Sequence, residues 1–186
     1  MAQAQAPKRE APSHGGEMKV ALDTNCFIDA VNPMAHANKA MRLIREAHES
    51  GRVTAMVSRH TLAELHDPPE ARRFAETLPV LPHWPIGTIA EQIATIEQLA
   101  GTWEDARRNE QIQNELEQLA KSGNDIRDRG AFLDALLGGV DAFVTSDKQV
   151  AASGPSTRIQ DRFGVRVLRP VDLAYELRDV RAERSD

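Results

Sequence analysis

The chain has 186 residues, the size of one domain with a substantial hydrophobic core. Hydrophobic residues make up 41% of it and aromatic residues only 4%, so we expect an aliphatic core. The net charge of −5 argues against a large, non-specific phosphate-binding surface, because such surfaces are usually basic.

The cysteine count and the hydropathy of the chain bear on its location. Cys26 is the only cysteine, which excludes an intrachain disulfide and a cysteine-rich zinc site and favours a reducing compartment. No apolar run reaches the length of a membrane span, and the first residues lack the layout of a secretory signal. We therefore expect a cytoplasmic protein that is not inserted in a membrane.

Both ends of the chain lack an apolar period. Residues 1–17, MAQAQAPKREAPSHGGE, are mostly alanine, glutamine, proline and glycine, a composition that predicts a disordered tail. Residues 181–186, RAERSD, have a similar character. We therefore expect one folded domain over residues 18–180.

Strand-like and helix-like segments alternate through the first half of this domain. Apolar runs predict strands, and apolar residues recurring three and four positions apart predict helices. Proline at the start of a segment is compatible with a helix, but within a strand it restricts that strand to the edge of a sheet. In order, we predict a strand at Met18–Leu22, a helix over 35–50, a strand at Val53–Val57, a short helix capped by Ser58, a helix within 66–78 and an edge strand within 79–85.

The same alternation continues in the second half. We predict a bent helix or helical pair over 88–121, a helix from Asn124 or Asp125 to about Gly138, strands at Ala142–Thr145 and Val165–Leu168, and a last helix over Pro170–Leu177. Parallel strands need crossover connections, and helices between strands are the usual form of these. The predicted fold class is therefore α/β, a three-layer α/β/α sandwich with a mainly parallel central sheet.

Acidic residues follow the predicted strands. Asp23 comes directly after the first strand, and Glu64 lies on the short helix after the second. Asp147 ends the segment AFVTSD, which contains the third. Ligands of parallel sheets bind beyond the carboxyl ends of the strands, so we expect these three carboxylates at one edge.

Asp128 is expected to reach the same edge from the helix before the third strand. The ten residues from Asp128 to Gly138 span roughly 15 Å of helix. The five residues from Ala142 to Asp147 span roughly 16 Å of strand in the opposite direction. Four carboxylates in one pocket cannot all stay ionised without a cation, and their hard oxygen atoms suit Mg²⁺ or Mn²⁺ better than zinc.

Three segments together resemble the PIN-domain nucleases, the family that includes the VapC-type toxins. They are ALDTNCFID near the start, SRHTLAELHD after the second strand, and DRGAFLDALLGGVDAFVTSDKQV toward the end. The resemblance covers roughly residues 18–177 in order and spacing. It departs from minimal toxins in the longer, more charged segment 88–123 and in the N-terminal extension.

The resemblance implies a metal-dependent endoribonuclease with Asp23, Glu64, Asp128 and Asp147 as an acidic quartet that binds Mg²⁺ or Mn²⁺. Asn25 and Thr145 would position the quartet and its waters. Metal-bound water would attack the phosphodiester and leave 5′-phosphate and 3′-hydroxyl ends. RNA is the implied partner, and a homodimer and an antitoxin are further expectations. The arginines that we expect to contact RNA phosphates are Arg42, Arg45, Arg59 and Arg129.

Some assignments stay open at this stage. Asn25 is equally suited to capping a short helix, CFIDA, and Asp128 competes with Asp125, a plausible N-cap, and with Asp134. The spacing of the six histidines singles out no acid–base pair.

Two other functions compete with the nuclease hypothesis. A PIN-like module that binds RNA or protein without catalysis is the main alternative, and the complete quartet argues against it. A phosphohydrolase or receiver-type domain is disfavoured because LDTN lacks a D-x-D spacing.

Overall fold

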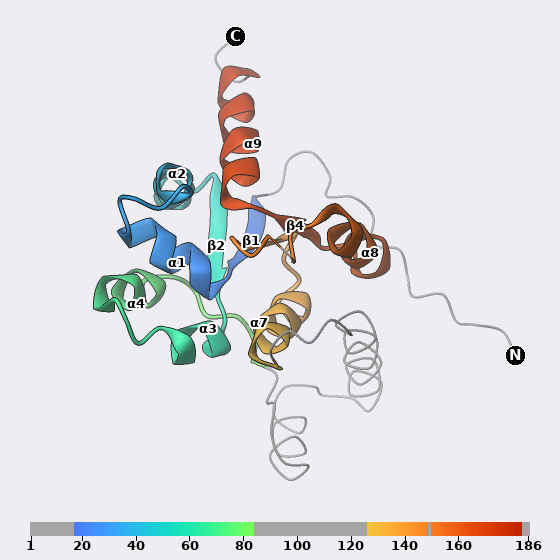
Figure 1. Cartoon of the computed structure of the whole chain (residues 1–186). Helices are drawn as coiled ribbons and strands as arrows, with labels where there is room; N and C mark the ends of the chain where they lie inside the picture. Colours follow the sequence, from blue (N-terminus) through green and yellow to red (C-terminus); the bar gives the residue numbers. More distant parts are fainter. Residues whose placement is uncertain (1–16, 84–125, 149, 184–186) are drawn as a thin grey trace, which may run out of the picture.

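The computed structural model describes residues 17–83, 126–148 and 150–183 (Figure 1). The predicted N-terminal tail, the helical segment 88–121 and the proposed caps Asn124 and Asp125 lie outside these residues, apart from residue 17. In the part of the chain that is described, every helix is too short or too polar to cross a bilayer.

Four parallel strands form the sheet, in the order β2-β1-β3-β4. Val20 in the centre of β1 lies opposite Ala55 of β2 and Ala142 of β3. An all-parallel sheet with helical crossovers confirms the predicted α/β class. The strands are β1 (Met18–Leu22), β2 (Val53–Val57), β3 (Ala142–Val144) and β4 (Arg166–Leu168).

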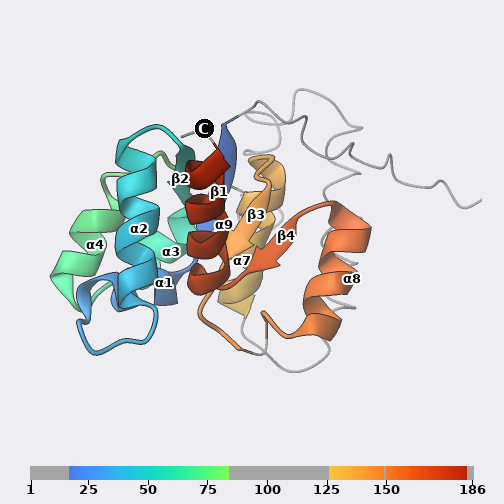
Figure 2. The ribbon, with the colours of Figure 1, turned by 90° about the horizontal axis from the view of Figure 1, so that it is seen from above.

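Helices cover both faces of the sheet (Figure 2). Alternate residues of each strand point to opposite faces, so each face has a core of its own. Val20 and Leu22 belong to the core on one face, whereas Ala21 and Phe143 belong to the core on the other. The first core is completed by α1 (Thr24–Val31), α2 (Asn38–Glu49), α4 (Pro69–Ala75) and α9 (Pro170–Glu183). The second is completed by α7 (Ile126–Leu137) and α8 (Ser153–Phe163).

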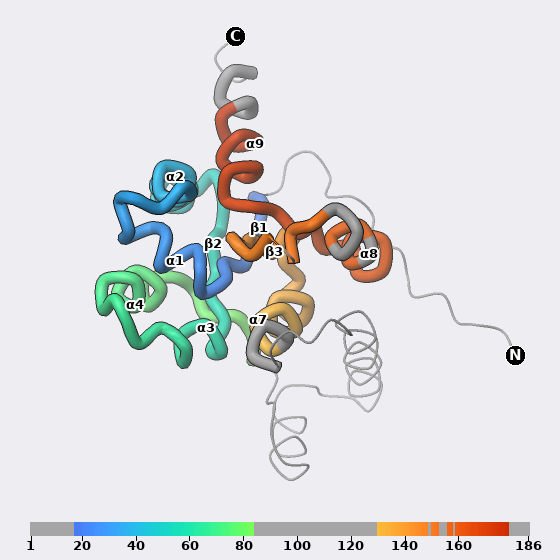
Figure 3. Tube along the Cα trace, viewed as in Figure 1, coloured from blue at the N-terminus to red at the C-terminus, as the bar shows by residue number. Residues whose placement is uncertain are grey.

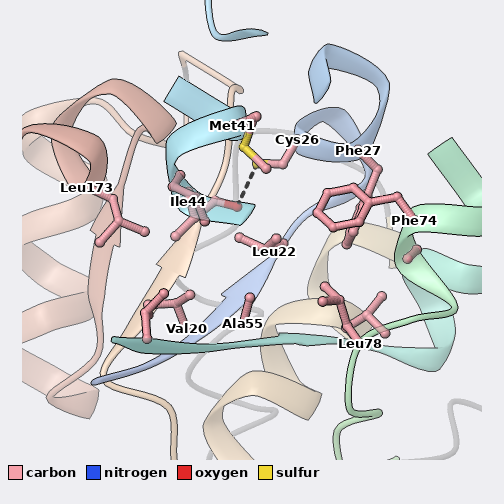
Figure 4. Close-up of a cluster of buried hydrophobic side chains, with 14 of the residues drawn as sticks. Val20, Leu22, Cys26, Phe27, Met41, Ile44, Ala55, Phe74, Leu78 and Leu173 are labelled. Atoms are coloured by element: carbon pink, nitrogen blue, oxygen red, sulfur yellow. Dashed lines mark hydrogen bonds between the residues drawn. The ribbon is translucent and has the colours of Figure 1, made fainter. Parts of the chain in front are cut away.

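The first core fixes α1 against the sheet, as Figure 4 shows. Phe27 of α1 is fully buried and meets Phe74 of α4 edge-on, with ring centroids 5.4 Å apart. Leu22, Met41 and Ile44 are equally inaccessible to solvent. Burial of each such side chain stabilises the fold by about 1.5–3 kcal/mol. The start of α1, which carries Asp23 and Thr24, therefore rests on a well-packed support.

Several element boundaries differ from the predictions. The second helix begins at Asn38 rather than residue 35, and the last helix runs to Glu183, into the predicted C-terminal tail. The predicted edge strand is reduced to a single parallel bridge between Val57 and Val80. Helix α8 is not among the predicted elements, and it ends at Gly164, whose φ of 70° is the left-handed conformation that glycine adopts readily.

Candidate active site

Asp23 links the end of β1 to the start of α1. It is the N-cap of α1, and its Oδ1 accepts a hydrogen bond from the backbone N–H of Thr24 at 2.8 Å. Its Oδ2 accepts a hydrogen bond from the Thr145 hydroxyl at 2.7 Å. The side chain is only 7% exposed. Asp23, and not Asn25, therefore caps this helix, and the exposed Asn25 lies within its first turn.

Thr145 connects two of the predicted acidic residues. It follows β3 and is fully buried, and its backbone N–H donates to Leu168 at the end of β4. While its hydroxyl donates to Asp23, the same oxygen accepts the backbone N–H of Asp147 at 3.0 Å. One threonine thus fixes an oxygen of Asp23 and the main chain of Asp147, as a positioning residue would.

Glu64 reaches the same edge of the sheet through a short helix, α3 (Arg59–Glu64). Ser58 follows β2 directly and caps α3 through its side-chain oxygen, as predicted, accepting the N–H of Thr61. Glu64 ends the helix, and its Oε2 accepts the hydroxyl of Thr24 at 2.6 Å. The sequence predictions gave Thr24 no role, although it lies between Asp23 and Asn25 in the DTN segment.

These three acids interact electrostatically. Burial raises the pKa of Asp23 above its ordinary value, and the negative charges of Glu64 and Asp147 add to that rise. The hydrogen bonds from Thr145 and Thr24 act in the opposite direction. Among the described residues, no cation contributes to the pKa of Asp23. Asp23, Glu64 and Asp147 are called the carboxylate cluster below.

The remaining predicted site residues are only partly described. The backbone of Asp128 and Arg129 lies in the first turn of α7, but their side chains lie outside the described part of the structure. Of the other arginines, Arg42 and Arg59 are exposed, whereas Arg45 pairs with Glu49 and lies over the ring of Phe74.

Two neighbours of the cluster carry reactive groups. Asp29 is half-buried and accepts the Ser146 hydroxyl at 2.6 Å. Cys26 is completely buried, and its thiol donates to the carbonyl of Val144 at 3.2 Å. Burial and the charge of Asp23 raise the pKa of the Cys26 thiol, which keeps it protonated. Such a thiol is a poor nucleophile.

A second group of polar side chains was not predicted. The group consists of His60 of α3, His83 and Asp134 of α7. Helix α3 packs beside α7, as the trace in Figure 3 shows. Nδ1 of His83 lies 3.3 Å from Oδ2 of the fully buried Asp134, and the two imidazole centroids are 4.9 Å apart. Burial, together with the charge of Arg59, lowers the pKa of His83. These three residues are called the histidine cluster below.

The sequence held one signal for the histidine cluster. Asp134 interrupts a run of apolar residues in α7, from Ala131 to Leu137, and a carboxylate there needs a partner. The histidines themselves are far apart in the chain, so their spacing carried no signal. The competing assignment of Asp134 to the acidic quartet finds no support, since its side chain contacts His83.

Comparison with known proteins adds no family assignment: neither the protein-family models nor the curated proteins include a match to this chain.

Proposed function

We propose that the chain is a Mg²⁺- or Mn²⁺-dependent endoribonuclease of the PIN-domain type. The observation that carries this proposal is that Glu64 and Asp147, which follow β2 and β3, act on the pKa of the buried carboxyl group of Asp23, which follows β1. One oxygen from each of these three described residues does not come within 4.8 Å of the other two, so an ion would have to draw them together. Negative charges around a buried carboxyl group are stabilised when a cation neutralises them.

The donor set fits a hard divalent cation. An ionised carboxylate accepts about four hydrogen bonds or metal contacts, and two donors engage Asp23 among the described residues. Oxygen ligands from carboxylates are those that Mg²⁺ and Mn²⁺ prefer. Asp23, Glu64 and Asp147 would therefore hold the ion, with Asp128 as the fourth acid that the resemblance implies. When bound, the ion would supply a Lewis acid and lower the pKa of a bound water.

The protein's own groups would orient this site. Thr145 and the Thr24 N–H hold both oxygens of Asp23, and the Thr24 hydroxyl holds one oxygen of Glu64. These bonds fix the ligands before an ion or RNA arrives, which reduces the reorganisation needed for catalysis. The buried, protonated thiol of Cys26 speaks against covalent cysteine catalysis at this edge.

The test is cleavage of a labelled single-stranded RNA of mixed sequence in Mn²⁺, with Asp23→Asn as the key variant. We expect Asp23→Asn to lose more than about 100-fold in rate, beyond the range for loss of an outer-shell partner. Asp141→Asn is the matched control, because Asp141 lies before β3 at the opposite edge and accepts the N–H of Lys19. EDTA should stop cleavage and added Mn²⁺ restore it.

Two results would argue against the proposal. Full activity of Asp23→Asn would exclude the carboxylate cluster as the active site. Binding of RNA without cleavage by the unmodified protein, at saturating Mn²⁺, would favour the inactive PIN-like binding module. A homodimer, an antitoxin partner and a cytoplasmic location remain part of the proposal, and light scattering at working concentration tests the first of these.

A further inference from the structure

The histidine cluster combines three side chains that bind transition metals, from three separate segments of the chain. His60 lies on α3, His83 follows the bridge between Val57 and Val80, and Asp134 lies in the middle of α7. One candidate ligand atom from each lies within 4.8 Å of the others. None of the three belongs to the carboxylate cluster, so this group needs its own explanation.

The His60 ring is held in place without a hydrogen bond at one of its nitrogens. Among the described residues, its buried Nε2 has no partner. The ring lies so close to α7 that a Cβ on Gly130 would come within 2.7 Å of Nε2. Buried polar atoms in proteins nearly always have a partner, so an unpaired imidazole nitrogen beside a second imidazole and a carboxylate suggests a missing ligand.

We propose that His60, His83 and Asp134 form a binding site for a divalent transition-metal ion, with Zn²⁺ as the ion that fits best. Imidazole and carboxylate groups are common zinc ligands, whereas Mg²⁺ rarely takes imidazole. The site is therefore chemically distinct from the carboxylate cluster. It also goes beyond the proposed ribonuclease activity and does not depend on it.

The spacing is close to that of a zinc site. Bonds of about 2.0–2.2 Å in a tetrahedral arrangement put ligand atoms roughly 3.3–3.5 Å apart. His83 Nδ1 and Asp134 Oδ2 already have this separation, at 3.3 Å. The remaining pairs of ligand atoms lie within 4.8 Å, and coordination of one ion would bring them closer together. Three protein ligands leave a fourth position for water, as in zinc sites that keep an open coordination position.

A purely structural role is the competing explanation. Asp134 would then serve to bond His83, and the His60 ring would fill space against Gly130. That explanation accounts for the 3.3 Å contact but leaves Nε2 of His60 unsatisfied. It also predicts no metal affinity, so the two explanations separate in one titration.

The experiment is a titration of the full, metal-stripped chain with Co²⁺, followed by its visible absorption bands, and a competition with Zn²⁺. Saturating Mg²⁺ is present throughout, and each variant is also prepared with Asp23→Asn, so that the carboxylate cluster contributes nothing. His83→Gln removes a partly exposed ligand and should leave the fold intact. Asp134→Asn keeps the shape of a buried ligand, and His66→Gln is the control at an exposed histidine outside the cluster.

We expect one Co²⁺ per chain, displaced by Zn²⁺, both with and without Asp23→Asn. His83→Gln should weaken Co²⁺ binding by more than about 100-fold, the upper end of the loss for an outer-shell partner. Asp134→Asn should weaken it comparably, and His66→Gln should leave it unchanged. Absence of stoichiometric Co²⁺ or Zn²⁺ binding, or unaltered binding by a folded His83→Gln variant, would overturn the proposal.

Discussion

The carboxylate cluster and the histidine cluster are built in different ways. The carboxylates of Asp23 and Asp147 follow strands of one sheet, and Glu64 is the last residue of a six-residue helix after a third strand. The histidine cluster instead forms where two helices pack, and its members are held by contacts between side chains. The first arrangement follows from sheet topology, whereas the second depends on how α3 and α7 meet.

The two clusters also differ in how their groups are satisfied. Hydroxyl and N–H donors from Thr24 and Thr145 engage the carboxylates, yet burial and the charges of Glu64 and Asp147 still oppose ionisation of Asp23. The histidine cluster contains a ring nitrogen with no partner among the described residues. Like charges around Asp23 thus distinguish the first cluster, and a ring nitrogen without a partner among the described residues distinguishes the second. In the two proposals, a hard cation would neutralise the carboxylates, and a separate borderline cation would bind the unpaired ring nitrogen.

Thr145→Val should have the largest effect of the variants below, although a smaller one than Asp23→Asn. It removes the donor to Asp23 and the acceptor for the Asp147 N–H, both in a buried position. We expect cleavage to fall by about 10–100-fold, and the free energy of unfolding to fall by about 1–3 kcal/mol. RNA cleavage and urea unfolding measure these changes. Thr145→Ser keeps the hydroxyl and should retain most of the activity, so equal activities of the two variants would rule out the positioning role.

Gly130→Ala tests the packing that forms the histidine cluster. Alanine in place of glycine within a helix is normally stabilising by about 1 kcal/mol. Here the new Cβ would lie 2.7 Å from the His60 ring, and overpacking of this kind costs about 1–3 kcal/mol. Urea unfolding should therefore show no gain, and a net loss of up to about 2 kcal/mol. A full gain in stability would mean that His60 is not tightly held.

The stability of the metal-free protein should depend on pH through Asp23. Its pKa is raised in the folded state, so its contribution to stability is complete below the ordinary value of 3.8 and is lost as pH rises through the folded pKa. Asp23→Asn does not titrate and still serves as a helix cap. In EDTA, the variant should therefore gain stability relative to the unmodified protein between pH 4 and 7, measured by urea unfolding. A difference that stays constant over this range would contradict the raised pKa.

Asp172→Asn should have the smallest effect on stability. The contribution of Asp172 changes with pH in the opposite direction to that of Asp23, because Asp172 has a cationic partner. Its hydrogen bond from Arg169 lowers its pKa, so its contribution to stability is present above 3.8 and lost as pH falls through the folded pKa. The pair is exposed and screened, so Asp172→Asn should cost at most about 1 kcal/mol at pH 7. Urea unfolding at pH 7 and pH 3 measures this loss, and a larger loss at the lower pH would contradict the assigned sign.

The sequence was a good guide where hydrophobic runs and strand ends decide the structure. Val20–Leu22 and Val53–Val57 are apolar enough to identify two central strands, and residues directly after such strands must lie at one edge of a parallel sheet. That argument placed Asp23 and Asp147 without knowledge of any contact. The role of Thr24 was not predicted, because it depends on a hydrogen bond from its hydroxyl to Glu64, which belongs to another segment of the chain.

Helix α8 and the histidine cluster could not be predicted in this way. The sequence of α8, SGPSTRIQDRF, has glycine and proline in its first turn and little apolar periodicity, so local preferences do not favour a helix. Ile159 and Phe163 pack on the second core, which supplies the missing stabilisation. His60, His83 and Asp134 meet only through the packing of α3 on α7, which no spacing in the sequence specifies.

The proposed metal site at Asp23, Glu64 and Asp147 is tested most directly by diffraction from crystals of the full chain soaked in Mn²⁺, with data collected at the manganese absorption edge. We expect an anomalous peak at the carboxyl edge of the sheet, within bonding distance of Asp23, Glu64 and Asp147, and its loss in Asp23→Asn crystals. An anomalous map without a peak at these carboxylates, at a Mn²⁺ concentration that gives binding in solution, would contradict the proposed metal site.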